Sequence, residues 1–167
     1  MYLSPDYIDS LPREQDSHEP IDLATLPSDP NRLFAQWFTD AVDRQVVDAR
    51  AVNVATVDKD GRPDARIVDL AFLDSKGFHF GTATDTAKVR HMEDTWAAAL
   101  NFWWQPVRRA VRVRGSAERA VDGERFNLWR VVPEHFEFFQ LSNDRLNSER
   151  IAYTLNSQGE WERNIIG

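Results

Sequence analysis

The sequence contains no cysteine, which excludes disulfides, thiolate nucleophiles and cysteine-ligated metal sites. No apolar run approaches the length of about 20 residues that a membrane-spanning helix needs. The first residues, Met1-Tyr2-Leu3-Ser4-Pro5-Asp6, lack the basic and apolar regions of a signal peptide. These absences predict a cytoplasmic protein that has no membrane partner.

Positive charge is also scarce. The chain has 20 Lys and Arg residues against 27 Asp and Glu, a net charge of −7 and a pI of about 5.1. An acidic protein is poorly suited to duplex nucleic acid, so we expect no nucleic-acid partner. A local basic pocket can still bind an anionic small molecule. The histidines show no metal-ligand spacing, so no metal site is predicted; they are His18, His79, His91 and His135.

The composition is that of a globular protein. At 167 residues, with 42% hydrophobic and 11% aromatic residues, the chain suits a single domain with a proper core. Prolines at 5, 12, 20 and 27 are expected to break any regular element in residues 1–29. The sequence therefore predicts an arm over 1–29, extended or partly disordered, and a single domain over 30–167.

Hydrophobic periodicity indicates mostly strands in the domain. A helix is expected from Pro30, capped by Asp29, to about Gln45, because apolar residues recur every three or four positions. A short helix capped by Thr84 or Asp85 is expected to run through Met92, and another to cover 122–130. Strands are predicted over 51–57, 65–73, 78–82, 96–104, 107–121, 136–139, 151–155 and 161–166. This pattern predicts a mainly β (α+β) fold, an antiparallel barrel decorated by helices.

The positions of two cationic residues, Arg66 and Lys88, predict a phosphate pocket. Arg66 falls among the apolar residues of a strand, and its planar fork of donors suits a dianion. Lys88 follows the threonine-rich loop 82–86, in the first turn of a short helix where backbone N–H groups favour an anion. Thr82 and nearby amides would complete this pocket. The alternatives are that Arg66 is a rim residue paired with an acidic side chain, and that Lys88 is a solvated surface lysine.

Three further segments are distinctive: Leu33–Phe38, Asp58–Val68, and Val131–Gln140 followed by Arg145-Leu146. Together these segments resemble the pyridoxamine 5′-phosphate oxidase family of FMN-binding split barrels. The resemblance is that of a divergent and shortened member of the family. It implies a split antiparallel β-barrel with flanking helices. It also implies a homodimer with FMN in a cleft between the subunits. The cofactor-binding residues it implies are Arg66, Ile67, Val68, Thr82, Lys88, Phe139 and Arg150. The substrate-binding residues it implies are Arg145 and Asn147.

The departures from that family concern mainly the substrate. Ala71 stands where the family has a lysine for the substrate phosphate, and Asn147 stands where it has a histidine. Ala87 and Ala110 replace an arginine and a glutamine near the flavin, and a helical insert before the C-terminal signature is missing. The resemblance therefore implies an FMN-dependent oxidoreductase acting on a small organic substrate other than pyridoxamine phosphate. The alternatives are a non-catalytic flavin- or ligand-binding split barrel, or a relative that uses deazaflavin or haem.

Overall fold

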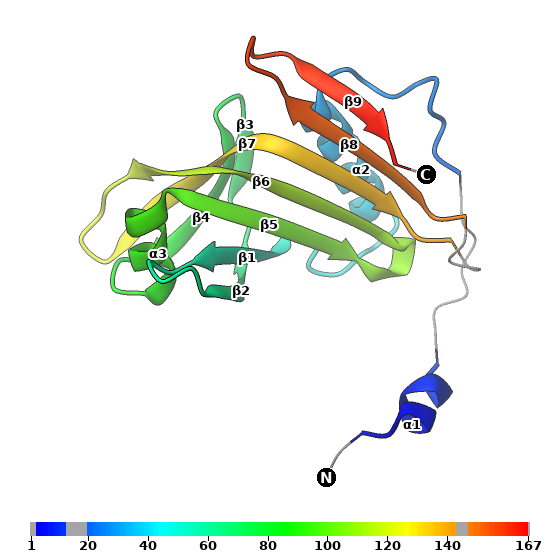
Figure 1. Ribbon diagram of the computed structural model, residues 1–167, viewed down its shortest axis with the longest axis horizontal. Helices are drawn as coiled ribbons and strands as arrows, with labels where there is room; N and C mark the ends of the chain where they lie inside the picture. Colours follow the sequence, from blue (N-terminus) through cyan, green and yellow to red (C-terminus); the bar gives the residue numbers. More distant parts are fainter. Residues whose placement is uncertain (1–2, 13–19, 143–146, 167) are drawn as a thin grey trace.

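The computed structural model describes residues 3–12, 20–142 and 147–166. Within these ranges, nine antiparallel strands form one curved sheet flanked by helices (Figure 1). The strands are β1 (Ala51–Val57), β2 (Pro63–Asp69), β3 (Phe72–Asp74), β4 (Gly77–Ala83), β5 (Ala97–Trp104), β6 (Arg109–Val121), β7 (Phe126–Gln140), β8 (Glu149–Leu155) and β9 (Trp161–Ile165). The helices are α1 (Pro5–Ser10), α2 (Pro30–Asp43) and α3 (Ala87–Thr95), with a 3-10 turn at Gln105–Val107. None of the described helices is both long and apolar enough to span a bilayer.

The sheet follows the order β2-β1-β5-β6-β7-β4-β3. Strand β7 is shared: residues 126–131 pair with β4, while residues 135–140 pair with β8. One long strand therefore joins both parts of the barrel, and the split-barrel fold predicted from the sequence is confirmed. The two ends of β7 lie far apart along the barrel (Figure 1).

Helix α2 fits the sequence prediction closely. The Asp29 side chain accepts a hydrogen bond from the backbone N–H of Asn31 at 2.9 Å, and Pro30 occupies the first turn. Phe34 is buried and packs edge-to-face on Phe78 at 4.8 Å between ring centroids. The helix ends at Asp43, because Gln45 adopts a left-handed conformation with φ of 62°.

The strand predicted over 65–73 is wrong as a single element. Strand β2 pairs with β1 and ends at Asp69, whereas β3 begins at Phe72 and pairs with β4. Between them, Leu70 N–H donates to Arg50 O and Ala71 N–H donates to His79 O. The chain changes partner strand at this point, and local sequence carries no signal for such a change.

The helix predicted over 122–130 is also wrong. Residues 122–125 connect β6 to β7, and β7 continues through the strand expected at 136–139. Asn127, Trp129 and Val131 are buried in alternation, the period of a strand, and Trp129 lies between Phe80 of β4 and Arg119 of β6. Pairing on both sides overrides the local helical preference.

Other boundaries differ from the predictions as well, most of them by one or two residues. Pro5 begins helix α1 instead of breaking it, because the first helical turn needs no N–H there and Ser4 caps it. Helix α3 is preceded by Thr86, not by Thr84 or Asp85, and runs to Thr95. Strand β6 starts at Arg109, because Arg108 is left-handed with φ of 55°.

Gly115 offers a test of how closely β6 and β7 approach. It lies at a register shift between these strands, and a Cβ there would overlap the carbonyl oxygen of Val132. We expect Gly115→Ala to lower the free energy of unfolding by about 1–3 kcal/mol, measured by urea denaturation. Gly81→Ala is the control, since a Cβ at Gly81 meets nothing within 4 Å. Equal stability of the two variants would contradict this description of the bulge.

Candidate functional site

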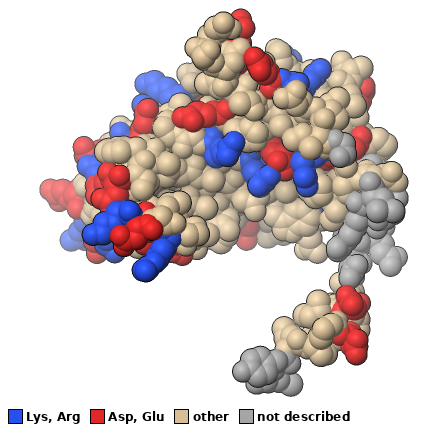
Figure 2. Space-filling view, viewed as in Figure 1, with Lys and Arg blue, Asp and Glu red and all other residues tan. Residues whose placement is uncertain are grey.

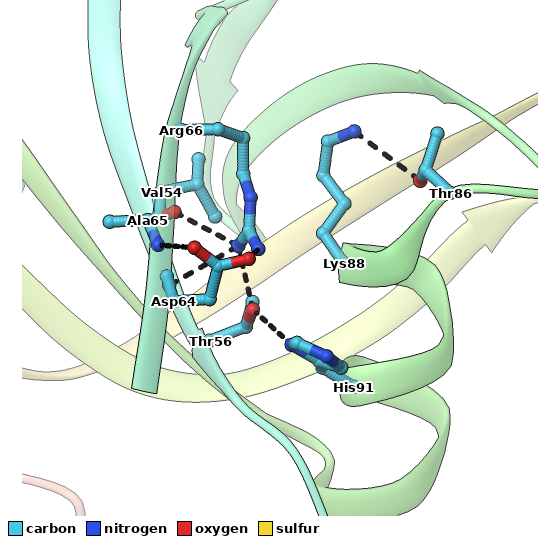
Figure 3. Close-up of polar contacts among 8 residues, drawn as sticks. All are labelled: Val54, Thr56, Asp64, Ala65, Arg66, Thr86, Lys88 and His91. Carbon is cyan, nitrogen blue, oxygen red and sulfur yellow. Dashed lines mark hydrogen bonds and ion pairs between the residues drawn. The ribbon is translucent and has the colours of Figure 1, made fainter. Parts of the chain in front are cut away.

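Arg66 lies on β2, directly opposite Val54 of β1, and its side chain is only 21% exposed. Its Nη1 donates to the Thr56 hydroxyl at 2.6 Å and to the Val54 carbonyl at 3.2 Å. Its Nη2 forms an ion pair with Asp64 Oδ2 at 2.8 Å (Figure 3). The acidic partner required by the rim interpretation is therefore present, and the guanidinium is also held by a buried hydroxyl on the other side.

Lys88 lies in the first turn of α3, where the sequence places it, and comes close to Arg66 (Figure 3). Its Nζ donates to the Thr86 hydroxyl at 3.3 Å. Among the described residues no carboxylate forms an ion pair with Lys88. Burial, and to a lesser degree the Arg66 guanidinium, lowers the pKa of Lys88. Two partly buried cations from different elements thus repel each other, and an anion bound beside them would relieve this repulsion.

Threonine hydroxyls lie beside the two cations. Thr82 is buried at the end of β4, and its Oγ1 lies 3.4 Å from Oγ1 of Thr86. Thr86 in turn donates to the carbonyl of Ala83 at 3.2 Å. The space next to Gly81 is open. Hydroxyls, cations and a helix N-terminus therefore meet at one mouth of the barrel, a combination that suits a phosphate group.

Two polar residues of this mouth were missed by the sequence analysis. Thr56 lies between Arg66 and His91, whose Nδ1 is 3.0 Å from the Thr56 hydroxyl. The sequence does carry a signal for Thr56: it continues the buried alternation of Val52 and Val54, which places a hydroxyl on an apolar face. His91 follows Lys88 by three positions, which places both on one side of α3.

A second group of predicted site residues lies elsewhere. Phe139 of β7 and Arg150 of β8 face each other, with the guanidinium 5.1 Å from the ring centroid. Thr82 pairs with Asn127 near the start of β7, whereas Phe139 is near its end. Twelve residues of β7 separate these positions along the strand. In the sheet order, β1, β5 and β6 also lie between β2, which carries Arg66, and β7. One chain therefore does not bring Phe139 and Arg150 together with the group around Arg66.

The remaining predicted site residues differ in location and in solvent exposure. Ile67 and Val68 are on β2, an edge strand of the described sheet, with Ile67 66% exposed and Val68 packed against the core. Asn147 is exposed, and Arg145 lies outside the described residues. Ala110 of β6 is paired with Phe139, so the family glutamine position belongs to the second group.

The outer face of the sheet carries a separate hollow of about 540 Å³. Its polar lining consists of Asn53, Asn101, Arg112, Arg114, His135 and Glu137. Glu137 pairs with both Arg112 and Arg150, and burial, followed by Arg114, lowers the pKa of His135. Figure 2 likewise shows basic side chains interspersed with acidic ones on the visible face, without a large field of one sign. In the part of the chain that the structure describes, no three His, Asp or Glu side chains are grouped to hold a metal ion.

Part of this chain is similar in sequence to known proteins. The family model described as pyridoxamine 5′-phosphate oxidase matches residues 38–153. A pyridoxine/pyridoxamine 5′-phosphate oxidase of Azorhizobium caulinodans is 48% identical over 100 residues, which are 60% of this chain and 47% of that protein. The chain thus spans about half the length of the curated relatives it matches.

Two solved structures share the fold. PhzG of Burkholderia lata, in complex with tetrahydrophenazine-1-carboxylic acid, superposes with a TM-score of 0.78 at 21% identity, covering 86% of this chain and 94% of that one. A pyridoxamine 5′-phosphate oxidase-related, FMN-binding protein of Nostoc punctiforme gives 0.73 at 17% identity, covering 85% and 100%. The matched family model covers most of the barrel, from the end of α2 to β8, and on that basis this chain belongs to the pyridoxamine 5′-phosphate oxidase family.

Proposed function

We propose that this protein is an FMN-dependent oxidoreductase whose substrate is a small organic molecule other than pyridoxamine phosphate. The observation that carries the proposal is the meeting of Arg66 and Lys88 at one barrel mouth, each supplied by a different element. Membership in the family and the fold shared with an FMN-binding protein support the same cofactor.

The residues present fit the phosphate of FMN. Lys88 has a neutral hydroxyl as its hydrogen-bond partner and is destabilised as a cation by burial and by Arg66. A dianion beside both residues would reverse that effect. Thr82 and the first N–H groups of α3 would add further donors.

The ring of the flavin would lie along β2. Because β2 is an edge strand of the described sheet, part of its backbone N–H and C=O groups point away from β1 and are available to a ligand. Ile67 and Val68 are the β2 residues that follow Arg66, so the ring would run along the backbone from the phosphate. When bound, FMN supplies hydride chemistry, and these residues bind and orient it.

We further propose that two copies share each cofactor. Phe139 and Arg150 are the family's flavin-contacting positions, yet they lie at the opposite end of β7 from Thr82. Strands β1, β5 and β6 also lie between Arg66 on β2 and Phe139 on β7 in the sheet, so we expect the two groups of one chain to serve different cofactors. A second copy whose Phe139–Arg150 end lies against β2 would complete the site.

Pyridoxamine phosphate and pyridoxine phosphate are expected to be poor substrates. Ala71 supplies no cation, Asn147 replaces the histidine, and residues 122–125 leave no room for the family's helical insert. A buried substrate phosphate without its cations would be strongly disfavoured. Aldehyde formation from either compound by the FMN-loaded protein, followed by absorbance, should be at the no-enzyme rate. Turnover comparable to that of a family oxidase would contradict this assignment of Ala71 and Asn147.

A non-catalytic flavin-binding protein is the second candidate. It is favoured by the cluster itself, since its titratable groups, Lys88 and His91, lie with Arg66 at the proposed phosphate end of the cofactor and not at the flavin ring. Native mass spectrometry after purification with added FMN tests cofactor, stoichiometry and oligomeric state together. We expect a dimer that carries the added mass of FMN. The mass of haem or deazaflavin would show that the protein uses that cofactor instead, and the absence of any added mass would contradict the proposed function. Candidate amines and alcohols are then added to the FMN-loaded protein. Reduction of the bound flavin would indicate an enzyme, and no reduction would indicate a non-catalytic flavin-binding protein.

A further inference from the structure

The hydroxyl of Thr56 links two side chains from different elements. It lies 2.6 Å from Arg66 Nη1 and 3.0 Å from His91 Nδ1, and Thr56 is only 1% exposed (Figure 3). The link is therefore shielded from water, and the way its protons are arranged is set by the protein.

The donors and acceptors of this link can be assigned. A guanidinium only donates, so Thr56 Oγ1 accepts from Arg66. The hydroxyl has one proton of its own, and among the described residues its other hydrogen-bond partner is His91 Nδ1. A hydroxyl oxygen has two lone pairs and can accept twice, but if Nδ1 carried a proton, the buried hydroxyl proton of Thr56 would lack an acceptor among the described residues. The hydrogen bonds of the Thr56 hydroxyl are therefore complete when Nδ1 accepts, which is the tautomer with the ring proton on Nε2.

Arg66 is held from two sides that differ in charge. Asp64 is 59% exposed and negatively charged, so it competes directly with a phosphate for the guanidinium. Thr56 is neutral and buried, so it does not compete. When an anion takes over the contact with Asp64, the position of Nη1 is still fixed by the Thr56 hydroxyl at 2.6 Å and by the Val54 carbonyl at 3.2 Å, of which the hydroxyl is the shorter contact.

We propose that His91 is a positioning residue of the phosphate pocket. It fixes the Thr56 hydroxyl with a lone pair toward Arg66, and thereby holds the guanidinium beside Lys88. Helix α3 thus supplies both Lys88 and, three residues later, the group that orients the other cation. This inference rests on the proposed function for its ligand, but the position of Arg66 is a property of the ligand-free protein.

Two substitutions at His91 separate its role as acceptor from its volume. The amide oxygen of His91→Asn occupies nearly the place of Nδ1 and accepts without titrating. His91→Leu keeps the bulk and removes the acceptor. His135→Leu is the matched control, because its Nδ1 also lies 3.0 Å from a threonine hydroxyl, that of Thr154 on β8.

Nitrogen-15 NMR of the ligand-free full chain at neutral pH tests the link directly. We expect an unprotonated Nδ1 and a protonated Nε2 for His91. The guanidinium signals of Arg66 should shift or broaden in His91→Leu, and stay as in the parent in His91→Asn and His135→Leu. A proton on Nδ1 would overturn the inference, and so would Arg66 signals that are unchanged in His91→Leu. Both results are independent of FMN binding.

Titration with FMN and with inorganic phosphate then measures the consequence. His91→Leu should bind FMN about 3- to 10-fold more weakly, while His91→Asn and His135→Leu should stay within about twofold of the parent. Riboflavin, which lacks the phosphate, should not distinguish the variants. Equal losses in His91→Leu and His91→Asn would show a merely structural role. If the parent itself binds no FMN, the proposed function fails, and the NMR result still decides the position of Arg66.

Discussion

Replacing both Arg66 and Lys88 by alanine is expected to weaken FMN binding by roughly a hundredfold to ten-thousandfold. Each residue would donate to a doubly charged phosphate, and a hydrogen bond to a charged group contributes about 1.5–3 kcal/mol. The two contributions together convert to that loss of affinity. Each single variant should lose roughly a tenfold to hundredfold. Quenching of FMN fluorescence on titration measures all of these constants.

The matched control for this loss is the double variant Lys59→Ala/Arg62→Ala. It removes the same charge from the exposed turn between β1 and β2, so it reproduces the change in net charge without touching the barrel mouth. It should bind FMN as the parent does. Riboflavin should bind weakly to every variant and be indifferent to all of them. If Arg66→Ala binds FMN as tightly as the parent, Arg66 is only a rim residue held by Asp64.

Two defective variants are expected to restore one cofactor site when they are mixed. In one, Arg66 and Lys88 are replaced by alanine; in the other, Phe139 and Arg150 are. If each site takes Arg66 and Lys88 from one copy and Phe139 and Arg150 from the other, a mixed dimer holds one intact site. After unfolding and refolding together, random pairing makes about half of the dimers mixed, so FMN stoichiometry should reach about a quarter of the parent value.

The concentration of FMN decides whether this experiment is informative. It must saturate the parent while leaving each variant alone essentially empty, and equilibrium dialysis then gives the stoichiometry. Each variant refolded by itself is the control. A mixture that binds no more FMN than the two variants separately would mean that one chain forms its own site. Sedimentation of the parent as a monomer at micromolar concentration would lead to the same conclusion.

The sequence by itself determined the class of fold and the position of several elements. Alternation of apolar residues located β1, and the caps Asp29 and Pro30 located α2, because these signals act within a few residues. The turn residues 58–61 fixed the β1–β2 hairpin. The sequence also placed Arg66 on a strand and Lys88 in the first turn of a helix, because strands and helix starts each have a local sequence pattern.

Only the tertiary structure decided features that depend on distant pairing. Residues 126–130 form a strand and not part of a helix because β4 and β6 pair with them from both sides, and nothing within the segment itself reports those partners. The division of the predicted strand 65–73 into β2 and β3 has the same cause. The polar link from Arg66 through Thr56 to His91 joins three elements, and the separation of Phe139 from Thr82 spans the length of β7. Such arrangements are set by packing and sheet register between segments far apart in the chain, which local periodicity and motifs do not encode.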